Sequence, residues 1–197
     1  MGIRLKWLYG YITDFTDQEY EAAYHTLSPT RRERINSLKK PLDRKRSLAG
    51  ELLMRRLLAD EYGVNDGIIE VSPNGKPVVS TKGLFISIAH SSDMVVCAAD
   101  DKGIGIDVEK IKPINISVAK KFCVAEELDY IVKDFDCNKL GYCEQRDILC
   151  RFYEIWTAKE AYFKSLGTGI TKLKSVNTLE LTRNIFYKDN YIIQIIN

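Results

Sequence analysis

The sequence lacks long hydrophobic runs, paired cysteines and a strong excess of either charge, and each absence excludes a class of protein. No stretch approaches the roughly 18 consecutive apolar residues that cross a membrane. The first residues (MGIRLKW) also lack the apolar core of a secretory signal. We therefore expect a cytoplasmic protein without a membrane partner. The five cysteines show no C-x-x-C spacing, which indicates reduced thiols in place of a disulfide framework or a zinc site.

The charge is nearly balanced, with 29 Lys and Arg against 27 Asp and Glu and a net charge of +2. Such a chain has no overall field that would draw it to nucleic acid, so we expect no nucleic-acid partner. The 197 residues are 45% hydrophobic, which is enough to build a real core in one large or two small domains.

Two acidic residues share one face of a strand predicted at residues 103–109 (GIGIDVE). Because side chains alternate along a strand, Gly105, Asp107 and Glu109 point to one side and the aliphatic residues to the other. The glycine is expected to leave open space beside the acids. Two neighbouring carboxylates repel each other unless a cation lies between them. Mg²⁺ suits this arrangement, and a chance pair of acids on a solvent-facing strand is the alternative.

A helix predicted at residues 151–164 carries a third acid on its hydrophobic face. Its aromatic residues recur at helical spacing, and Glu160 lies on the same stripe as Trp156. A buried acid needs a partner, and Lys159 and Lys164 are both near enough along the helix. An ordinary surface Glu–Lys pair is the simpler interpretation, but a carboxylate converging on the acid pair explains the position better. The predicted metal ligands are Asp107, Glu109 and Glu160.

Together, the two segments resemble the paired signature of the 4′-phosphopantetheinyl transferases. G-I-D-V-E at 105–109 is followed by W-x-x-K-E-A-x-x-K at 156–164. Three further landmarks are similar to the family, namely NGKP at 74–77, FISIAHS at 85–91 and FCVAEE at 122–127. The resemblance covers most of the chain, and the compound signature is far more specific than either half.

The resemblance implies an α+β fold made of two similar halves with a pseudo-twofold relation and the site between them. Two halves in one chain are typical of the larger, Sfp-type class of this family, whose members are monomeric, so we expect this chain to be a monomer of that class. A turn signal at 100–103 marks the predicted boundary. Residues 1–102 would then supply the coenzyme A nucleotide and phosphate contacts, and residues 103–197 the metal site and the carrier-protein contacts.

The local pattern predicts further elements in both halves. Helices are expected at residues 44–62 and at about 116–133. Strands are expected at residues 68–72, 77–80, 84–89, 94–99, 176–182, 184–187 and 191–196. A turn at 188–190 would join the last two strands into a hairpin.

Basic residues are concentrated ahead of the first long helix, at 31–34 and 39–46. A solvated helical face is one interpretation, and a nucleic-acid surface is another, although interleaved aromatic residues are missing. The resemblance implies a third, a cradle for coenzyme A, whose phosphates need Arg or Lys. By register it implies Arg31 and Arg34 at the 3′-phosphate, Arg46 and Ser47 near the nucleotide, and Lys76 and His90 at the phosphates. A structural histidine is the alternative for His90.

The resemblance also implies the reaction, in which a serine of an apo acyl, peptidyl or aryl carrier protein attacks the β-phosphate of coenzyme A. Mg²⁺ at the three carboxylates would stabilise the developing charge, and Lys164 and His90 would add positive charge. The serine proton would go to Glu160 or to a metal-bound water near Glu127, and the sequence leaves that choice open. Two other classes also stay open: another Mg²⁺-dependent phosphoryl-transfer enzyme, such as a nuclease, and a non-catalytic carrier-binding homologue.

Overall fold

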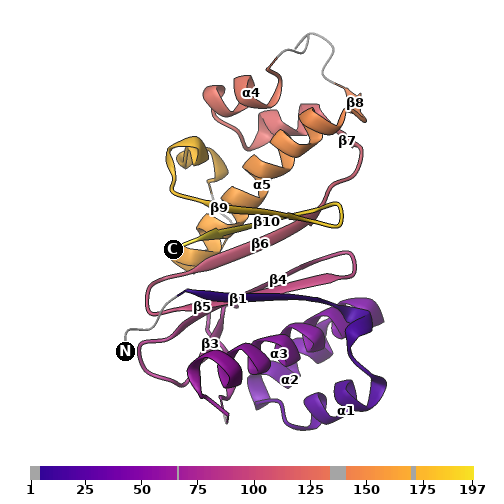
Figure 1. Ribbon diagram of the computed structural model, residues 1–197, viewed down its shortest axis with the longest axis vertical. Helices are drawn as coiled ribbons and strands as arrows, with labels where there is room; N and C mark the ends of the chain where they lie inside the picture. The colour runs from indigo at the N-terminus through magenta and orange to yellow at the C-terminus, as the bar shows by residue number, and fades with distance from the viewer. Residues whose placement is uncertain (1–4, 66, 134–140, 170–171) are drawn as a thin grey trace.

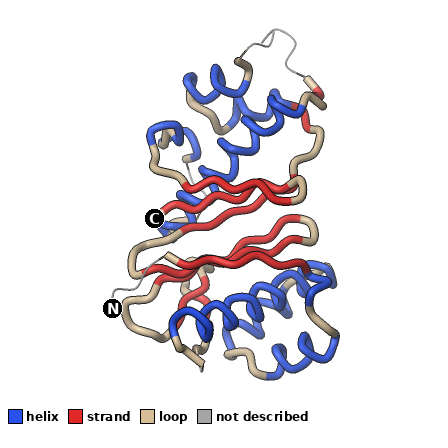
Figure 2. Tube along the Cα trace, in the orientation of Figure 1, coloured by secondary structure: helices blue, strands red, loops and turns tan. Residues whose placement is uncertain are grey.

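The chain forms two layered units, each with a three-stranded antiparallel sheet and helices on its outer side (Figure 1). The computed structural model describes residues 5–65, 67–133, 141–169 and 172–197. Along the longest axis the layers follow the order helices, sheet, sheet, helices, so that the two sheets adjoin in the middle (Figure 2). The predicted α+β fold is therefore confirmed. No helix within these ranges is long and apolar enough to cross a membrane.

The first unit is built on a sheet with the strand order β1-β5-β4. Its strands are β1 (Lys6–Tyr11), β5 (Met94–Asp100) and β4 (Phe85–Ser91). Its other elements are η1 (Ile12–Asp14), α1 (Asp17–His25), α2 (Pro29–Ser37), α3 (Pro41–Tyr62), β2 (Ile69–Val71) and β3 (Pro77–Val79). Helix α3 begins earlier than predicted because proline fits a first helical turn, and it ends where Gly63 takes a left-handed conformation. Elements β1, α1 and α2 are additional to those that the sequence pattern predicts.

The second unit is built on a sheet with the strand order β6-β10-β9. Its strands are β6 (Gly105–Lys110), β10 (Tyr191–Ile196) and β9 (Asn184–Lys188). Its other elements are β7 (Ile114–Asn115), η2 (Ile116–Lys121), α4 (Ala125–Ile131), β8 (Tyr142–Cys143), α5 (Arg146–Leu166), η4 (Leu173–Ser175) and η5 (Thr178–Glu180). The predicted C-terminal hairpin is present, with Asp189 and Asn190 in left-handed conformations at its turn. Helix α5 covers the outer face of this sheet, so the acid-bearing helix and strand belong to one unit.

Two predicted elements of the second unit are wrong in form. The helix expected at 116–133 is divided into η2 and α4, because the carboxylate of Glu127 accepts a hydrogen bond from the Val124 backbone N–H and starts a new helix there. The strand expected at 176–182 contains the short helix η5 instead. Asn177 caps its first turn, and Thr178 binds a carboxylate from α4 in place of a neighbouring strand.

The hydrophobic core has three layers, which explains why the central strands are apolar on both faces. In β5, Val95 and Cys97 pack toward α3, whereas Met94 and Val96 pack between the two sheets. The third layer lies between α5, α4 and the outer face of the second sheet. The cysteines in the described part of the chain form no disulfide, and Cys137 lies outside it. The free cysteines are Cys97, Cys123, Cys143 and Cys150.

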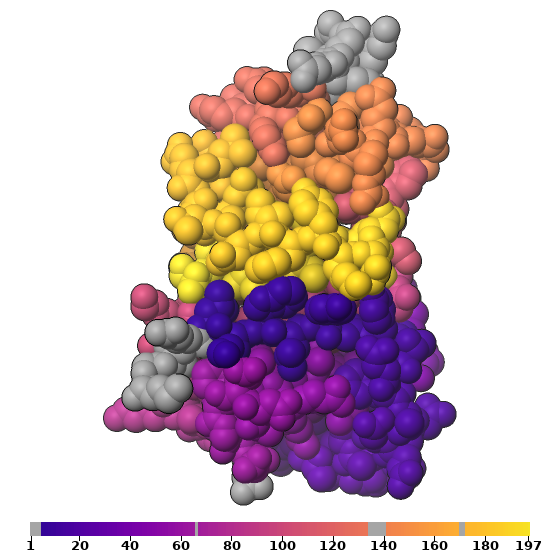
Figure 3. Space-filling view, viewed as in Figure 1, coloured from indigo at the N-terminus to yellow at the C-terminus, as the bar shows by residue number. Residues whose placement is uncertain are grey.

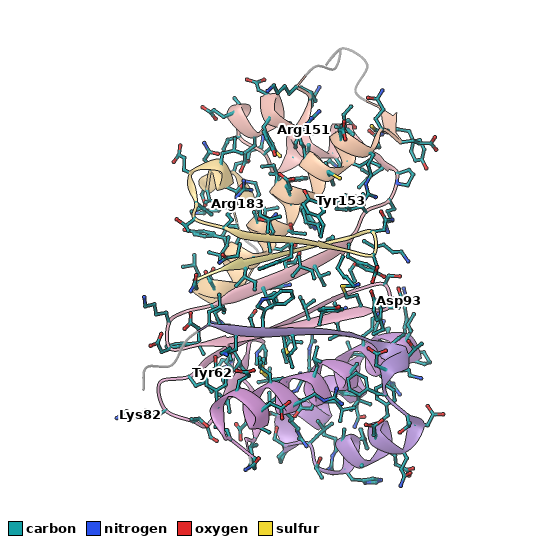
Figure 4. All side chains as sticks on the ribbon, viewed as in Figure 1. Tyr62, Lys82, Asp93, Arg151, Tyr153 and Arg183 are labelled. Carbon is teal, nitrogen blue, oxygen red and sulfur yellow. The ribbon has the colours of Figure 1, made fainter. Side chains whose placement is uncertain are left out.

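The two units also meet along β1 and the C-terminal hairpin, on the face shown in Figure 3. The rings of Trp7 and Phe186 lie 4.5 Å apart between centroids. A polar contact closes the same boundary near the β4–β5 turn, where the Tyr191 hydroxyl donates to the Asp93 carboxylate at 2.5 Å (Figure 4). Aromatic packing and hydrogen bonds therefore join the units on this side.

Candidate active site

A close approach between β6 and α5 creates the centre of the site. A Cβ atom at Gly105 would lie 1.8 Å from the Ala161 carbonyl oxygen and 2.6 Å from the Ser165 backbone nitrogen. The space predicted beside the two acids is therefore filled by the backbone of α5, and that expectation is wrong. The glycine serves instead to bring strand and helix together. As a result, Asp107 faces the charged residues of α5.

Asp107 is the most enclosed of the three carboxylates. Its Oδ1 atom accepts a hydrogen bond from Lys164 Nζ at 2.5 Å, while its Oδ2 atom is buried and has no hydrogen-bond partner among the described residues. The pKa of Asp107 is raised from 3.8 to about 6, mainly by burial and to a smaller extent by the charge of Glu109, and Lys164 opposes the rise. A buried anionic oxygen without a donor is a favourable position for a cation.

Glu109 is held at the boundary of the two units. Its Oε2 atom accepts a hydrogen bond from the Ser91 hydroxyl at 2.6 Å, and its Oε1 atom accepts one from Trp156 Nε1 at 3.3 Å. Ser91 belongs to β4 of the first unit and Trp156 to α5 of the second. Sequence reasoning missed these two positioning contacts, although both residues lie within the motifs that carry the family resemblance.

Glu160 is nearly buried beside the other two acids, with 9% of its surface exposed. The pKa of Glu160 is raised from 4.5 to about 7, mainly by burial and also by the charges of Asp107 and Glu109, and Lys164 opposes the rise. The charges of the other two carboxylates therefore affect the pKa of Glu160. Neither nearby lysine forms an ion pair with Glu160 in the described structure, because Lys164 pairs with Asp107 and Lys159 points elsewhere.

In the conformations that the structure describes, the three carboxylates do not form a complete metal-coordination site. Within the described ranges, no three His, Cys, Asp or Glu side chains converge closely enough to hold a metal ion by themselves. The donor chemistry nevertheless fits Mg²⁺, since carboxylates supply hard anionic oxygens and Asp107 Oδ2 is buried with no hydrogen-bond partner among the described residues. Mg²⁺ is commonly held by one or two carboxylates and completed by water and substrate phosphates.

Glu127 and Lys159 form a separate pair inside the second unit. Both side chains are fully buried, and Lys159 Nζ lies 2.8 Å from Glu127 Oε2. The ammonium group also donates to the carbonyl oxygens of Leu173 and Val176, at 2.9 and 2.7 Å. Thr178 donates to Glu127 through both its backbone N–H and its hydroxyl, each at 2.8 Å. This geometry joins α4 and the segment around η4 and η5 to α5.

A cavity with basic walls lies in the first unit, and we call it the basic cavity. It is lined by Arg31, Arg34, Asp43, Ser47, Gly75 and His90, among others. Arg34 and Gly75 also line a neighbouring cavity between the units, whose walls include Lys76, Ser87 and Lys164. The two cavities therefore adjoin, and together their walls include the predicted 3′-phosphate residues and the lysine that pairs with Asp107.

The predicted basic residues differ in how they are held. Arg31 is 8% exposed and bonds to Glu51, so it is not part of a solvated helical face. Arg46 donates to the Asp43 carboxylate at 2.8 Å and to the Ser92 carbonyl at 2.5 Å.

Lys76 extends across the boundary between the units, where Nζ donates to the carbonyls of Ile104 and Ser165 at 3.4 and 3.2 Å. Burial lowers the pKa of this lysine.

His90 closes one side of the basic cavity. Partial loss of hydration lowers the pKa of its imidazole below 6.5, although much of the side-chain surface remains accessible. The positive charges of Arg46 and Lys164 lower it further, and Asp43 acts in the opposite direction. Without a bound anion, the ring is therefore mostly neutral at pH 7, and a phosphate beside it would favour the protonated form.

Comparisons with known proteins match both units. A family model described as "4'-phosphopantetheinyl transferase, N-terminal" matches residues 14–102. A model described as "4'-phosphopantetheinyl transferase superfamily" matches residues 103–188.

Individual relatives extend over both regions. The chain is 33% identical over 170 residues to the 4′-phosphopantetheinyl transferase Sfp of Bacillus subtilis, covering 83% of this chain and 71% of the relative. It is 34% identical to the 4′-phosphopantetheinyl transferase psf-1 of Bacillus pumilus, covering 73% of this chain and 59% of the relative. It is 32% identical to the 4′-phosphopantetheinyl transferase HetI of a Nostoc species, covering 77% of this chain and 64% of the relative.

Proposed function

The chain belongs to the 4′-phosphopantetheinyl transferase superfamily, and from this premise we propose that it transfers 4′-phosphopantetheine from coenzyme A to a serine of an apo carrier protein. The observation that carries the proposal is that two charged regions adjoin. The basic cavity shares the wall residues Arg34 and Gly75 with the cavity that Lys164 lines, and Lys164 is paired with the carboxylate that lies beside two further acids. A phosphorylated nucleotide with a diphosphate fits that order of charges.

We assign the nucleotide end of coenzyme A to the basic cavity. Arg31, Arg34 and Ser47 would contact the 3′-phosphate end, and His90 and Lys76 the phosphates nearer the acids. Arg46 is held by Asp43 and the Ser92 carbonyl, so it adds positive charge beside His90. The nucleotide would thus be bound mainly by the first unit.

Phosphoryl transfer depends on positioning and charge stabilisation more than on covalent help from the protein. Lys164 would donate to a phosphate oxygen and stabilise the charge on the leaving nucleotide. Glu160 would accept the proton of the attacking serine, because it lies beside Asp107, whereas Glu127 is fully buried by its own partners. Asp107, Glu109 and Glu160 would hold Mg²⁺, which when bound supplies positive charge to the diphosphate oxygens.

The test is mass spectrometry of an apo carrier protein incubated with this protein, coenzyme A and Mg²⁺. We expect the carrier to gain the mass of one phosphopantetheine group, and we expect EDTA to prevent the gain. Asp107→Asn should reduce the transfer rate by about 100-fold or more. The exposed Asp101→Asn is the matched control and should transfer at the wild-type rate. No mass gain on acyl, peptidyl and aryl carriers would contradict the proposal, and normal turnover by Asp107→Asn would contradict the metal assignment.

A further inference from the structure

A buried ion network lies directly behind the basic cavity. Glu51 of α3 is fully buried, and its two carboxylate oxygens bind two different guanidinium groups. Arg31 Nε donates to Oε2 at 3.0 Å, and Arg55 Nε donates to Oε1 at 3.0 Å. A carboxylate without solvent contact is stable only when such donors surround it. Neither Glu51 nor Arg55 is among the residues that motif reasoning assigned to the site.

The network is anchored on the side away from the cavity. Arg55 Nη1 donates to the Thr26 hydroxyl at 2.7 Å, and Nη2 donates to the Thr26 carbonyl at 3.2 Å. Thr26 directly follows α1 and caps its C-terminal end. Three helices therefore contribute to one rigid arrangement, in which α1 holds Arg55, Arg55 holds Glu51, and Glu51 holds the arginine of α2.

Only part of the Arg31 guanidinium is used by this arrangement. Its Nη2 atom approaches the Ser47 carbonyl and hydroxyl oxygens, both at 3.4 Å. Its Nη1 atom donates to none of the residues that the structure describes, and Arg31 itself lines the basic cavity with Ser47 and His90. The guanidinium thus keeps donors for a ligand while its Nε edge is fully engaged.

We propose that Glu51, supported by Arg55, is a positioning residue that holds Arg31 ready for the 3′-phosphate of coenzyme A. The inference rests on the proposed function, since it assumes a nucleotide with that phosphate. A free arginine loses considerable rotamer entropy when it binds a ligand, whereas an arginine already held in place does not. Glu51 also offsets one of two neighbouring positive charges, so Arg31 and Arg55 can lie close together before any anion binds.

A purely structural role for Glu51 makes a different prediction. If the network only joined the helices, its loss would weaken the binding of every nucleotide to a similar extent. If it positions Arg31, its loss weakens only ligands that carry the 3′-phosphate. Two probes that differ in that one group, adenosine 3′,5′-bisphosphate and adenosine 5′-monophosphate, separate the two roles without any need for turnover.

The experiment is isothermal titration calorimetry of both probes with the wild type and with Glu51→Gln. The amide keeps the shape of the side chain, but it offers one acceptor where the carboxylate offered two, and its NH₂ group faces a guanidinium. We expect the bisphosphate Kd to rise roughly tenfold or more, and the monophosphate Kd to change by less than about twofold. Glu61→Gln makes the same substitution at a partly exposed position of α3 and should change neither value.

Two further variants keep the inference testable if Glu51→Gln does not fold. Arg55→Lys loses the two-sided contact with Glu51 and Thr26 but keeps the charge, and it should weaken bisphosphate binding selectively and to a smaller extent. Arg31→Gln should weaken bisphosphate binding at least as much as Glu51→Gln does. The double variant should bind no more weakly than Arg31→Gln alone, because Glu51 acts through Arg31.

Equal weakening of both probes, unchanged or tighter bisphosphate binding, or additive effects in the double variant would overturn the inference. A wild type that does not prefer the bisphosphate would overturn it as well. The carrier assay with coenzyme A decides the proposed function separately. Transfer by the wild type together with unselective loss in Glu51→Gln would reject only the positioning role, whereas selective loss without transfer would reject only the transferase reaction.

Discussion

The two units share a layered plan but contribute opposite charges and different helix–sheet contacts. The first unit supplies Arg31, Arg34 and His90, and the second supplies the three carboxylates. Each unit also has one glycine where its long helix meets its sheet. In the first, a Cβ at Gly50 would lie 2.7 Å from a side-chain methyl of Ile88, whereas in the second the obstacle is backbone. The basic unit can therefore adjust locally at this contact, and the acidic unit cannot.

Alanine substitutions at the two glycines should show this difference most strongly. Gly105→Ala forces apart β6 and the backbone of α5, so we expect it to destabilise the protein by about 4 kcal/mol or more, or to prevent folding. Gly50→Ala needs only a shift of Ile88 and gains about 1 kcal/mol of helix propensity, so we expect a loss below about 2 kcal/mol. Urea denaturation of both variants measures the two values. A similar loss in both would contradict the comparison.

Buried ion pairs allow a second test of the acidic unit. Lys159→Met removes the ammonium group that binds Glu127 and two carbonyl oxygens, and leaves a carboxylate buried without its cation. We expect a loss of about 3 to 5 kcal/mol. Adding Glu127→Gln should recover part of that loss, because it removes the unpaired charge. Denaturation of the single and double variants provides the measurement, and a double variant less stable than Lys159→Met would show that the pair is not coupled in this way.

The smallest expected effect lies at the boundary between the units. Hydrogen bonds from Tyr191 and Ser92 lower the pKa of Asp93 from 3.8 to about 2. Because the folded-state pKa is below the unfolded one, the stabilisation is complete above about pH 4 and is lost as the pH falls toward 2. Asp93→Asn should therefore be less stable than the wild type at pH 6, by less than about 1 kcal/mol since the carboxylate is half exposed.

Denaturation at pH 6, 4 and 3 should show the Asp93→Asn difference becoming smaller below pH 4. A difference that is independent of pH would show that the carboxylate charge contributes nothing at this boundary. Lys110→Gln, which removes the partner 3.7 Å from Asp93, should have a weaker effect than Asp93→Asn because the hydrogen bond from the tyrosine hydroxyl lowers the pKa of Asp93 more than the charge of Lys110 does.

The local sequence pattern was sufficient to predict a helix or strand where the segment is regular and its partners are close in sequence. The alternation around Asp107 correctly predicted a strand, and the aromatic spacing around Trp156 correctly predicted a helix. Helix α1 was missed because its composition is polar, although Thr16 and Glu19 form a capping box that signals its start. Helix α2 likewise begins with a capping serine followed by Pro29.

Other features depend on partners far away in the chain. The segment 176–182 alternates like a strand, yet Glu127 binds Thr178 and turns it into a short helix. The partner of Lys159 could not be read from its own helix, because that partner lies in α4. Similarly, nothing near Arg31 in the sequence indicates its partner Glu51, because Glu51 belongs to the following helix, α3. The charged residues of the site could be identified from the sequence, but three-dimensional packing decides which of them form ion pairs.

Lys76 links the two units at the site. It starts beside the β2–β3 turn of the first unit and ends on two carbonyl oxygens of the second. The neighbouring Asn74 also donates across the boundary, to the Gly167 carbonyl at 3.3 Å. These contacts therefore help to maintain the separation between the basic cavity and the acids. A ligand that contacted residues of both units would therefore have to match the separation that these contacts maintain.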